Sequence, residues 1–429
     1  MRNPKEPKNH VAKLGNYLFS LGLFFSIQAT KEPTLIITEY FAMSIPDETL
    51  LLQINKGAIE PNTSDFENQY LALFKTFLCN TEEERKRLSN TIEFWDSIPR
   101  YSVTRRQQNT LRDEKTGMLP TYITQFCYKG ETFRIEIVPA RLNAFDENGN
   151  RMFDQKNMPL TVDYYPSNRE ELVEAALRKI ATRHSSGFMR DKSSDANDVV
   201  FSGVMFSLYE LMTELADTGH TFSYQQLTES LNILNSSQIK IYKEDSKKKD
   251  TGLVSSNYLP VLAAVTRDHY LADSSSKWMI HFHPFVTQGI LMLAYCQYNY
   301  KLMMGLSSQL CRWIHKYICI KFTQASLIGS PFEIHYKTIK RDSGLLARKR
   351  ERANFTDIEE ALNELKTKNV LSEWTKTEVL GARGKKLDTI YRISPSIEFI
   401  RETKAANKRK GDAVEIEAGN LKKARNRIS

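Results

Sequence analysis

Four cationic side chains gather in one short segment of the chain: Arg348, Lys349, Arg350 and Arg352. Guanidinium and ammonium groups donate hydrogen bonds to phosphate oxygens and to the edges of nucleic-acid bases. Arg348 and Arg352 are four residues apart, so they share one face if a helix begins near Leu345. If the helix begins at Thr356 instead, the cluster lies in the preceding turn and mainly contacts phosphates. DNA contact is favoured over a solvated charged face because the charge pattern and the expected elements agree.

Further side chains are candidates for the same kind of surface. They lie in the expected helix before the cluster, at a hairpin tip after it, and in an earlier helix and loop. These residues are Lys337, Lys340 and Arg341; Arg383, Lys385 and Lys386; Gln225 and Gln226; and Lys247, Lys248 and Lys249. At the hairpin tip and in the lysine-rich loop, an ordinary solvated polar surface is the alternative to DNA binding.

The positive charge of the chain is concentrated in two segments. The 429 residues carry a formal net charge of +9. Residues 335–352 hold seven Lys or Arg against two acidic residues, and residues 401–429 hold nine against four. The rest of the chain is therefore close to neutral, as expected when basic residues mark a phosphate-binding surface.

The elements around the basic cluster are typical of a winged helix-turn-helix. A helix near Tyr336–Arg341 ends at the turn residue Gly344, and a capping box of Thr356 and Glu359 indicates the next helix. Four apolar residues of that helix are expected to point inward: Ile358, Ala361, Leu362 and Leu365. The expected hairpin strands are Leu371–Val379 and Thr389–Ile393. Residues 301–400 are therefore predicted to form a winged-helix domain.

An earlier segment has the same order of elements without an obvious sequence repeat. Five apolar residues are expected on one helix face: Val204, Leu208, Leu211, Met212 and Leu215. Gly219 should end that helix, and a second helix should begin near Ser223. The expected strands are Gln238–Tyr242, Tyr258–Thr266 and Lys277–His283. Residues 199–300 are therefore predicted to form a first winged-helix domain.

The remaining regions complete an α+β fold: tandem winged-helix (helix-turn-helix) domains, an additional N-terminal α/β region and a disordered basic C-terminal tail. The expected regions are a mostly helical 1–97, which includes a helix at Glu83–Trp95, an α+β domain at 98–198 that ends in a linker at Thr182–Asp198, and the tail at 401–429. Within 98–198, two strands should meet at Lys129-Gly130. Ser167 and Glu170 should form a capping box.

One motif points to an enzyme instead. His281 and His283 form a His-hydrophobe-His pattern like that of metal-dependent nickases, and alternate residues of a strand share a face. Possible nucleophiles follow: Tyr295, Tyr298 and Tyr300. A three-residue motif arises easily by chance, and no third metal ligand is evident. The sequence also has no Walker-type phosphate loop, GxSxG, HExxH or paired-carboxylate pattern, so we expect no catalytic residues, no metal and no cofactor.

Composition indicates a globular protein in a reducing compartment. Hydrophobic residues make up 41% and charged residues 26% of the chain. The five cysteines have no metal-ligand spacing, which is typical of reduced buried thiols. The apolar run Tyr17–Ile27 resembles a secretory signal, but it also fits a core helix or a start codon upstream of the true one, with Met43 available. We expect a cytoplasmic protein associated with the nucleoid or a plasmid.

Residues 98–400 resemble the theta-type plasmid replication initiators, a family built from two winged helices. The similar segments are PSNREELVEAALRKIA (166–181), GVMFSLYELMTELADTGHTFSYQQLTESLNIL (203–234), KWMIHFHPFV (277–286) and 305–365, which contains RDSGLLARKRERANFTDIEEALNEL. The resemblance implies binding of repeated origin sites (iterons), local opening of A·T-rich DNA, and recruitment of the host initiator and the replicative helicase. It assigns the main major-groove contacts to Arg348, Lys349, Arg350 and Arg352, and backbone contacts and possible homodimer formation to the first winged helix. The long N-terminal region departs from the minimal two-domain form.

Two other functions stay open. A winged-helix transcriptional regulator would use the same modules, bind one or two sites and leave the duplex closed. A rolling-circle nickase would need the His-x-His pair, a tyrosine and a divalent metal, and it would form a covalent link to DNA.

Overall fold

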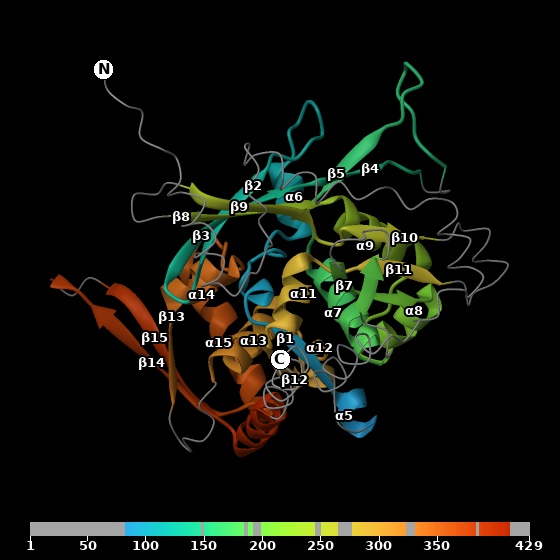
Figure 1. The fold of residues 1–429 in the computed structure, drawn as a ribbon. Helices are drawn as coiled ribbons and strands as arrows, with labels where there is room; N and C mark the ends of the chain where they lie inside the picture. Colours follow the sequence, from blue (N-terminus) through green and yellow to red (C-terminus); the bar gives the residue numbers. More distant parts are fainter. Residues whose placement is uncertain are drawn as a thin grey trace, which may run out of the picture.

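The computed structural model of the protein describes residues 82–146, 150–183, 188–191, 199–244, 250–264, 277–322, 331–382 and 386–411. In these residues, helices and several small antiparallel sheets form a mixed α/β fold (Figure 1). Buried side chains from Ile92 to Ile400 belong to one continuous hydrophobic cluster, so the described parts share a core. The sequence also predicts that residues 1–81 are mostly helical, and this prediction lies outside the described residues.

A four-stranded sheet of order β2-β3-β8-β9 lies across the top of Figure 1. Its strands are β2 (Tyr122–Tyr128), β3 (Glu131–Val138), β8 (Gln238–Glu244) and β9 (Asp250–Asn257). The turn predicted between β2 and β3 is confirmed, with φ of 48° at Lys129 and 82° at Gly130. This sheet crosses the position predicted as a domain boundary at residue 198, because Phe133–Val138 of β3 pair with residues 238–243 of β8.

Three helices pack beside a second sheet, of order β10-β11-β7-β6. They are α7 (Asn168–Arg183), α8 (Leu208–Ala216) and α9 (Tyr224–Ser236), and the strands are β6 (Phe188–Asp191), β7 (Val199–Phe206), β10 (Val261–Ala263) and β11 (Trp278–His281). One half of the capping box predicted before α7 is present, since the backbone N–H of Ser167 donates to the Glu170 carboxylate; the Oγ of Ser167 donates to the same carboxylate. Gly219 has a φ of 88° in the turn after α8, as predicted.

Strand pairing overturns two predictions in this region. Val204 does not lie on a helix face, because it belongs to β7 and pairs with Ile280 of β11. The helix begins only after Ser207, whose Oγ accepts the N–H of Glu210. The linker predicted at 182–198 contains β6, which pairs with β7. The partner of β7 in β11 is distant in sequence, and local periodicity does not reveal such a pairing.

A two-stranded sheet brings the N-terminal described residues to the middle of the fold. The elements here are α5 (Glu82–Arg87), β1 (Leu88–Ile92), η1 (Trp95–Ser97), α6 (Arg105–Leu111), α11 (Pro284–Leu291), β12 (Tyr295–Asn299) and α12 (Tyr300–Met304). The single helix predicted at Glu83–Trp95 is wrong. All five residues of β1 are buried and pair antiparallel with β12, and this pairing outweighs the local helical pattern.

The C-terminal elements include the two helices and the hairpin that the sequence predicts, together with a strand, β13, that it did not predict. They are α13 (Gln309–Lys321), β13 (Phe332–His335), α14 (Tyr336–Ser343), α15 (Glu351–Thr367), β14 (Leu371–Leu380) and β15 (Lys386–Pro395), with the sheet order β13-β15-β14. The capping box predicted at Thr356 is wrong, because α15 already begins at Glu351 and the Thr356 hydroxyl donates to the carbonyl of Arg352. Asn354 and Ile358 are four residues apart and both buried, so the buried face extends N-terminal of Thr356.

The tail predicted to be disordered from residue 401 is helical at its start, since residues 397–411 form a helix. Phe399 and Ala406 are buried on one side of it. Arg409 is buried as well and donates to Gln297 and Glu84. Packing and ion pairing therefore compensate for the positive charge that indicated disorder. Residues 412–429 are not among those described.

A hairpin of β4 (Ala140–Asn143) and β5 (Thr161–Tyr164) projects from the upper part of the molecule (Figure 1). Its outer part exposes five large apolar side chains: Phe145, Met152, Phe153, Met158 and Leu160. Within the described part of the chain, no helix has the length and apolar character that a membrane crossing requires.

Candidate nucleic-acid interface

A buried amide fixes the turn between α14 and α15. Gly344 ends α14 with a φ of 65°. The Oδ1 of Asn354 then accepts the backbone N–H of Arg348 at 3.1 Å, and its Nδ2 donates to the carbonyl of Arg348 at 3.3 Å. The same Nδ2 also donates to the hydroxyl of Tyr336 on α14 at 3.3 Å. Asn354 therefore joins both helices to the turn. Asn354 was not identified from the sequence. Its position four residues before the inward-facing Ile358, where a polar residue is unusual, could have pointed to it.

We expect Asn354→Ala to lower the free energy of unfolding by about 1–3 kcal/mol, because polar groups in and around the turn lose their partner. The turn that carries the cations should also loosen, so DNA affinity should fall. Chemical denaturation and a binding titration measure the two effects. Asn363→Ala is the matched control on the exposed face of the same helix, where its Oδ1 accepts from Trp374. Equal losses in both variants would contradict a special role for Asn354.

The basic cluster lies at the N-terminal end of α15, between the two predicted alternatives. Arg348 and Lys349 precede the helix, Arg350 is its N-cap residue, and Arg352 lies in its first turn. All four side chains are exposed. The N-terminus of a 17-residue helix carries partial positive charge and free N–H groups, which add to the attraction for phosphate.

The cations of this region differ in how they are paired. Arg348 forms a bidentate ion pair with Asp357, and this hydrogen-bonded pair raises the pKa of the guanidinium. Lys340 lies 3.8 Å from Glu351. The cations without an ion pair to any residue in the described ranges are Lys349, Arg350, Arg352 and Lys337.

Arg341 has a different environment from the other predicted contacts. Its guanidinium donates to Asp342 at 2.6 and 2.8 Å, and the same carboxylate accepts the backbone N–H of Cys127 on β2. Hydrogen bonding to Asp342 raises the pKa of Arg341. The residue therefore supports the contact between α14 and β2, and its position favours a structural role.

The β14–β15 hairpin packs against one flank of α15. Lys386 lies 4.1 Å from the ring centroid of Phe355, and its Nζ bonds Glu378 at 2.7 Å. Further along, Lys376 pairs with Glu359 at 2.7 Å. Arg352, Thr356 and Glu360 on the outer face of α15 are exposed. The other two predicted hairpin-tip residues, Arg383 and Lys385, fall outside the described residues.

Fewer of the contacts predicted in residues 199–300 can be placed in the structure. Gln225 and Gln226 are exposed at the start of α9, as predicted. Gln226 is partly occupied, because its Oε1 accepts the backbone N–H of Ser223 in a capping box. The predicted contacts at 247–249 are in a gap of the described ranges.

The two histidines of the His-x-His motif differ in environment: His283 is buried in the core, whereas His281 is half-buried. The Nδ1 of His283 accepts the N–H of Phe285 at the start of α11, and its ring stacks on Trp95 at 4.1 Å. Burial lowers the pKa of His283 to about 3, so the ring is neutral. The tyrosines named as nucleophiles are buried, and burial raises their pKa values. Within the residues described, no group of three possible metal ligands is found.

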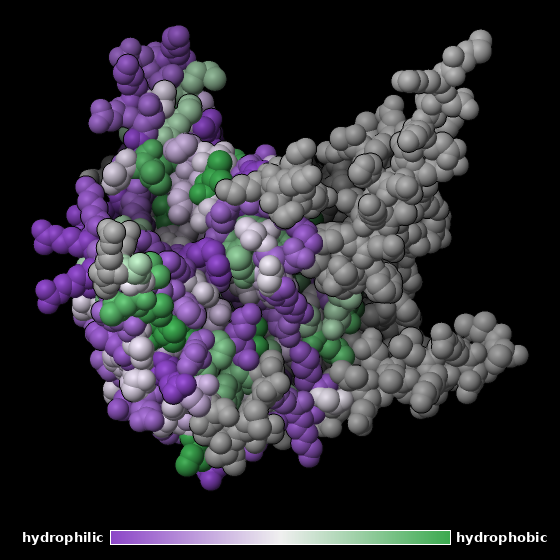
Figure 2. Space-filling model, turned by 90° about the vertical axis from the view of Figure 1, so that its left-hand side faces the viewer, coloured by the Kyte–Doolittle hydropathy of each residue, from purple (hydrophilic) through white to green (hydrophobic). Residues whose placement is uncertain are grey.

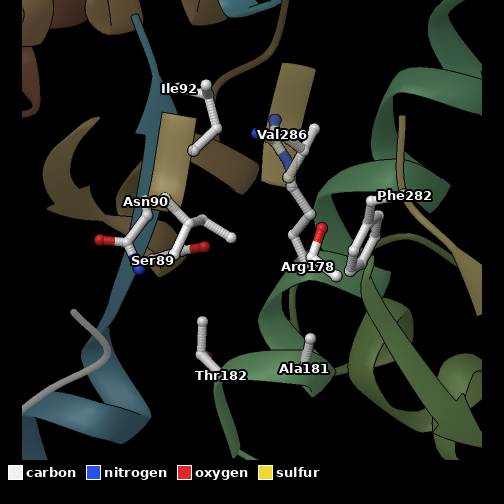
Figure 3. A pocket seen from close by; sticks show the side chains of 10 residues that line it. Ser89, Asn90, Ile92, Arg178, Ala181, Thr182, Phe282 and Val286 are labelled. Carbon is white, nitrogen blue, oxygen red and sulfur yellow. The ribbon is translucent and has the colours of Figure 1, made fainter. Parts of the chain in front are cut away.

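The surface around β13, β14 and β15 is mostly hydrophilic, with small separate hydrophobic patches (Figure 2). A cavity of about 20 Å³ lies elsewhere, between β1, α7 and α11 (Figure 3). Asn90 and Arg178 line it, and it has room for one water. Since none of its lining residues comes from α14, α15 or the β14–β15 hairpin, it is separate from the basic cluster.

No protein-family model and no curated protein matches this chain. Among solved structures, domains 2 and 3 of RctB, as a selenomethionine derivative, match over 67% of this chain and 93% of that chain, with 10% identity and a TM-score of 0.38. A second structure of RctB domains 2–3 matches over 67% and 94%, with 10% identity and a TM-score of 0.37. The Pi initiator protein in complex with iteron DNA matches over 53% and 94%, with 13% identity and a TM-score of 0.36. All three are remote likenesses.

Proposed function

We propose that this protein binds specific double-stranded DNA sequences through α15. The observation that carries the proposal is the exposed basic turn at the N-terminus of α15, which the buried Asn354 joins to Tyr336 of α14. A helix, a strand, two helices and a hairpin in this order are the parts of a winged helix, in which the second helix of the turn enters the major groove. Lys337, Lys340 and the hairpin tip would lie along the phosphates.

We further propose that this DNA is a replication origin with repeated sites. The sequence resemblance over residues 98–400 supports an initiator, and the chain has no Walker-type motif for ATP hydrolysis. Opening a duplex costs roughly 1–2 kcal/mol per base step in lost stacking. A protein without ATP can supply this by binding several sites together and bending the DNA. The host initiator and the replicative helicase would then act on the opened strand.

We propose that the chain contains another winged helix, N-terminal to the one around α15, and that it consists of α7, α8, α9 and the β8–β9 hairpin. Gln225 and the lysines at 247–249 would contact the DNA backbone, and this module would also support a homodimer. The protein would act in the cytoplasm on nucleoid or plasmid DNA, as a binding protein without a catalytic site or cofactor.

DNase footprinting across the DNA beside the gene, with permanganate probing of the same samples, tests this function. Protection repeated every one or two helical turns, with reactive thymines beside it, is the expected result. A single protected palindrome without reactive thymines would indicate a transcriptional regulator instead. No protection at moderate salt would overturn DNA binding. A covalent adduct on single-stranded DNA would identify a nickase.

Removing Lys349 and Arg350 together should weaken binding to every sequence by a similar factor. Each cation that contacts a phosphate contributes about one unit to the slope of log K against log salt, so the slope should fall by about two units in Lys349→Ala, Arg350→Ala. Titrations at several salt concentrations measure the slope. An unchanged slope, or a change in which bases are preferred, would contradict the assignment to phosphates.

A further inference from the structure

The guanidinium of Arg348 is held in one orientation by a single carboxylate. Its Nε–H donates to Oδ2 of Asp357 at 2.8 Å, and its Nη2 donates to Oδ1 at 3.0 Å. The pair lies at the surface, where 62% of the Arg348 side chain is exposed. An arginine has five N–H donors in a planar fork, and this pairing uses two of them. The edge between the two terminal nitrogens, with two parallel N–H groups, has no partner among the described residues.

The backbone of the same arginine is also fixed. Asn354, which is fully buried, bonds both the N–H and the carbonyl of Arg348. Lys349, Arg350 and Arg352 have no ion pair with a residue of the described segments. Arg348 is thus the cation of the cluster that is positioned at both its backbone and its charged group. Such positioning lowers the entropy lost on binding and favours recognition that depends on direction.

Asp357 lies beside the open face of α15. Arg352, Thr356 and Glu360 follow one another at four-residue spacing on this face, and all three are exposed. The β14–β15 hairpin borders this face on one side, through the pair of Lys376 with Glu359, and Asp357 lies on the other side, about 200° around the helix from Glu359. The Arg348–Asp357 pair is therefore part of the surface that would enter a groove.

We propose that Arg348 recognises a guanine in the major groove through its free N–H edge, and that Asp357 is the positioning residue that presents this edge. The inference rests on the proposed function. Guanine offers two acceptors, O6 and N7, to a pair of parallel donors. A phosphate needs no such orientation, and a carboxylate about 3 Å from the guanidinium would repel it. The Asp357 partner therefore favours a neutral base edge over the DNA backbone.

The test begins with selection of bound duplexes from a random pool by the full chain. The selected duplex is then compared with copies in which each guanine is replaced in turn by 7-deazaguanine, which lacks the N7 acceptor. We expect one position where the wild type loses about ten- to a hundred-fold in affinity. Asp357→Ala and Arg348→Lys should lose that dependence. Glu360→Gln is the matched control, since it removes a carboxylate from the same face without breaking the pair.

Each outcome decides between the alternatives. If Asp357→Ala keeps the full guanine dependence, or changes affinity equally for all duplexes, Asp357 does not position Arg348 for a base. If the wild type selects a sequence but shows no 7-deazaguanine effect that depends on Arg348, the guanine assignment is overturned while DNA binding stands. If no sequence is selected, the proposed function itself fails. Both residues of the pair are at the surface, and a thermal melt verifies that the variants fold.

Discussion

Replacing Arg348 and Arg352 together by alanine should abolish specific DNA binding. The two side chains lie at the start of α15 and are both exposed. Losing a base contact and a second charged contact should remove about 2–6 kcal/mol of binding free energy on a specific duplex. Binding to an unrelated duplex should fall much less, because it depends on total charge. Anisotropy titrations of both duplexes at one salt concentration measure the difference.

Lys366→Ala with Lys368→Ala is the matched control for this double variant. It removes the same two charges from the opposite end of α15, where both lysines are exposed. We expect a small loss that disappears at high salt, with unchanged preference for the specific duplex. If the control lost as much specific binding as the arginine variant, the position of the cluster would not matter and the interface would lie elsewhere.

The parts of the fold that sequence predicted well are those with local causes. The turn at Lys129-Gly130, the bond from the Ser167 N–H to Glu170, the helix start at Ser223 and the helix end at Gly344 all occur as expected. Each depends on residues within four positions in the chain, so a reading of neighbouring residues contains the necessary information.

The parts that sequence missed depend on distant partners. The strand Leu88–Ile92 exists because β12 lies beside it, although more than 200 residues separate them. Residues 397–411 stay helical because Arg409 finds Gln297 and Glu84 in the folded protein. A local helical pattern or a high charge gives the wrong expectation when such contacts decide the conformation.

The candidate site was predictable in composition but not in geometry. Sequence identified the cations around Arg348, because charge clustering is visible in one dimension. It could not distinguish Arg341 from the cations that are available for DNA. Arg341 is paired with Asp342, which accepts the N–H of Cys127 on β2, 215 residues away. It also could not show that Asp357 orients Arg348. Pairing between side chains requires the fold, because either partner could equally face solvent.

A second large effect is expected in the buried ion cluster of α7. Arg178 donates to both oxygens of Asp96 at 2.8 and 2.7 Å, and Arg100 joins Asp96 to Glu174. All four side chains are almost completely buried. On the same helix, Glu171 pairs with Arg312 and Lys316 of α13. The cluster therefore connects η1 with α7, and α7 with the C-terminal elements.

Arg178→Met should lower the free energy of unfolding by about 3–5 kcal/mol, because it leaves the Asp96 carboxylate buried with one cation fewer. Adding Asp96→Asn should recover part of this loss, since the unpaired charge is then gone. Denaturant titration of the wild type, both single variants and the double variant measures the coupling. Arg87→Met is the control, because its pair with Glu402 is half exposed and should contribute at most about 1 kcal/mol.

The pH dependence of stability tests the same cluster independently. The arginines beside Asp96 hold the pKa of its carboxyl far below the usual range despite burial, and Arg100 and Arg178 lower the pKa of Glu174 to about 2. Between these values and about pH 4.5, the unfolded chain binds more protons than the folded chain. The stabilisation is therefore complete above about pH 4.5 and is lost as the pH falls toward 2. Unfolding curves at pH 7, 4.5 and 3 should show this loss in the wild type and a weaker one in the double variant. Parallel curves for the two proteins would mean that other carboxyls cause acid unfolding, and that the cluster does not couple η1 and α7 as proposed.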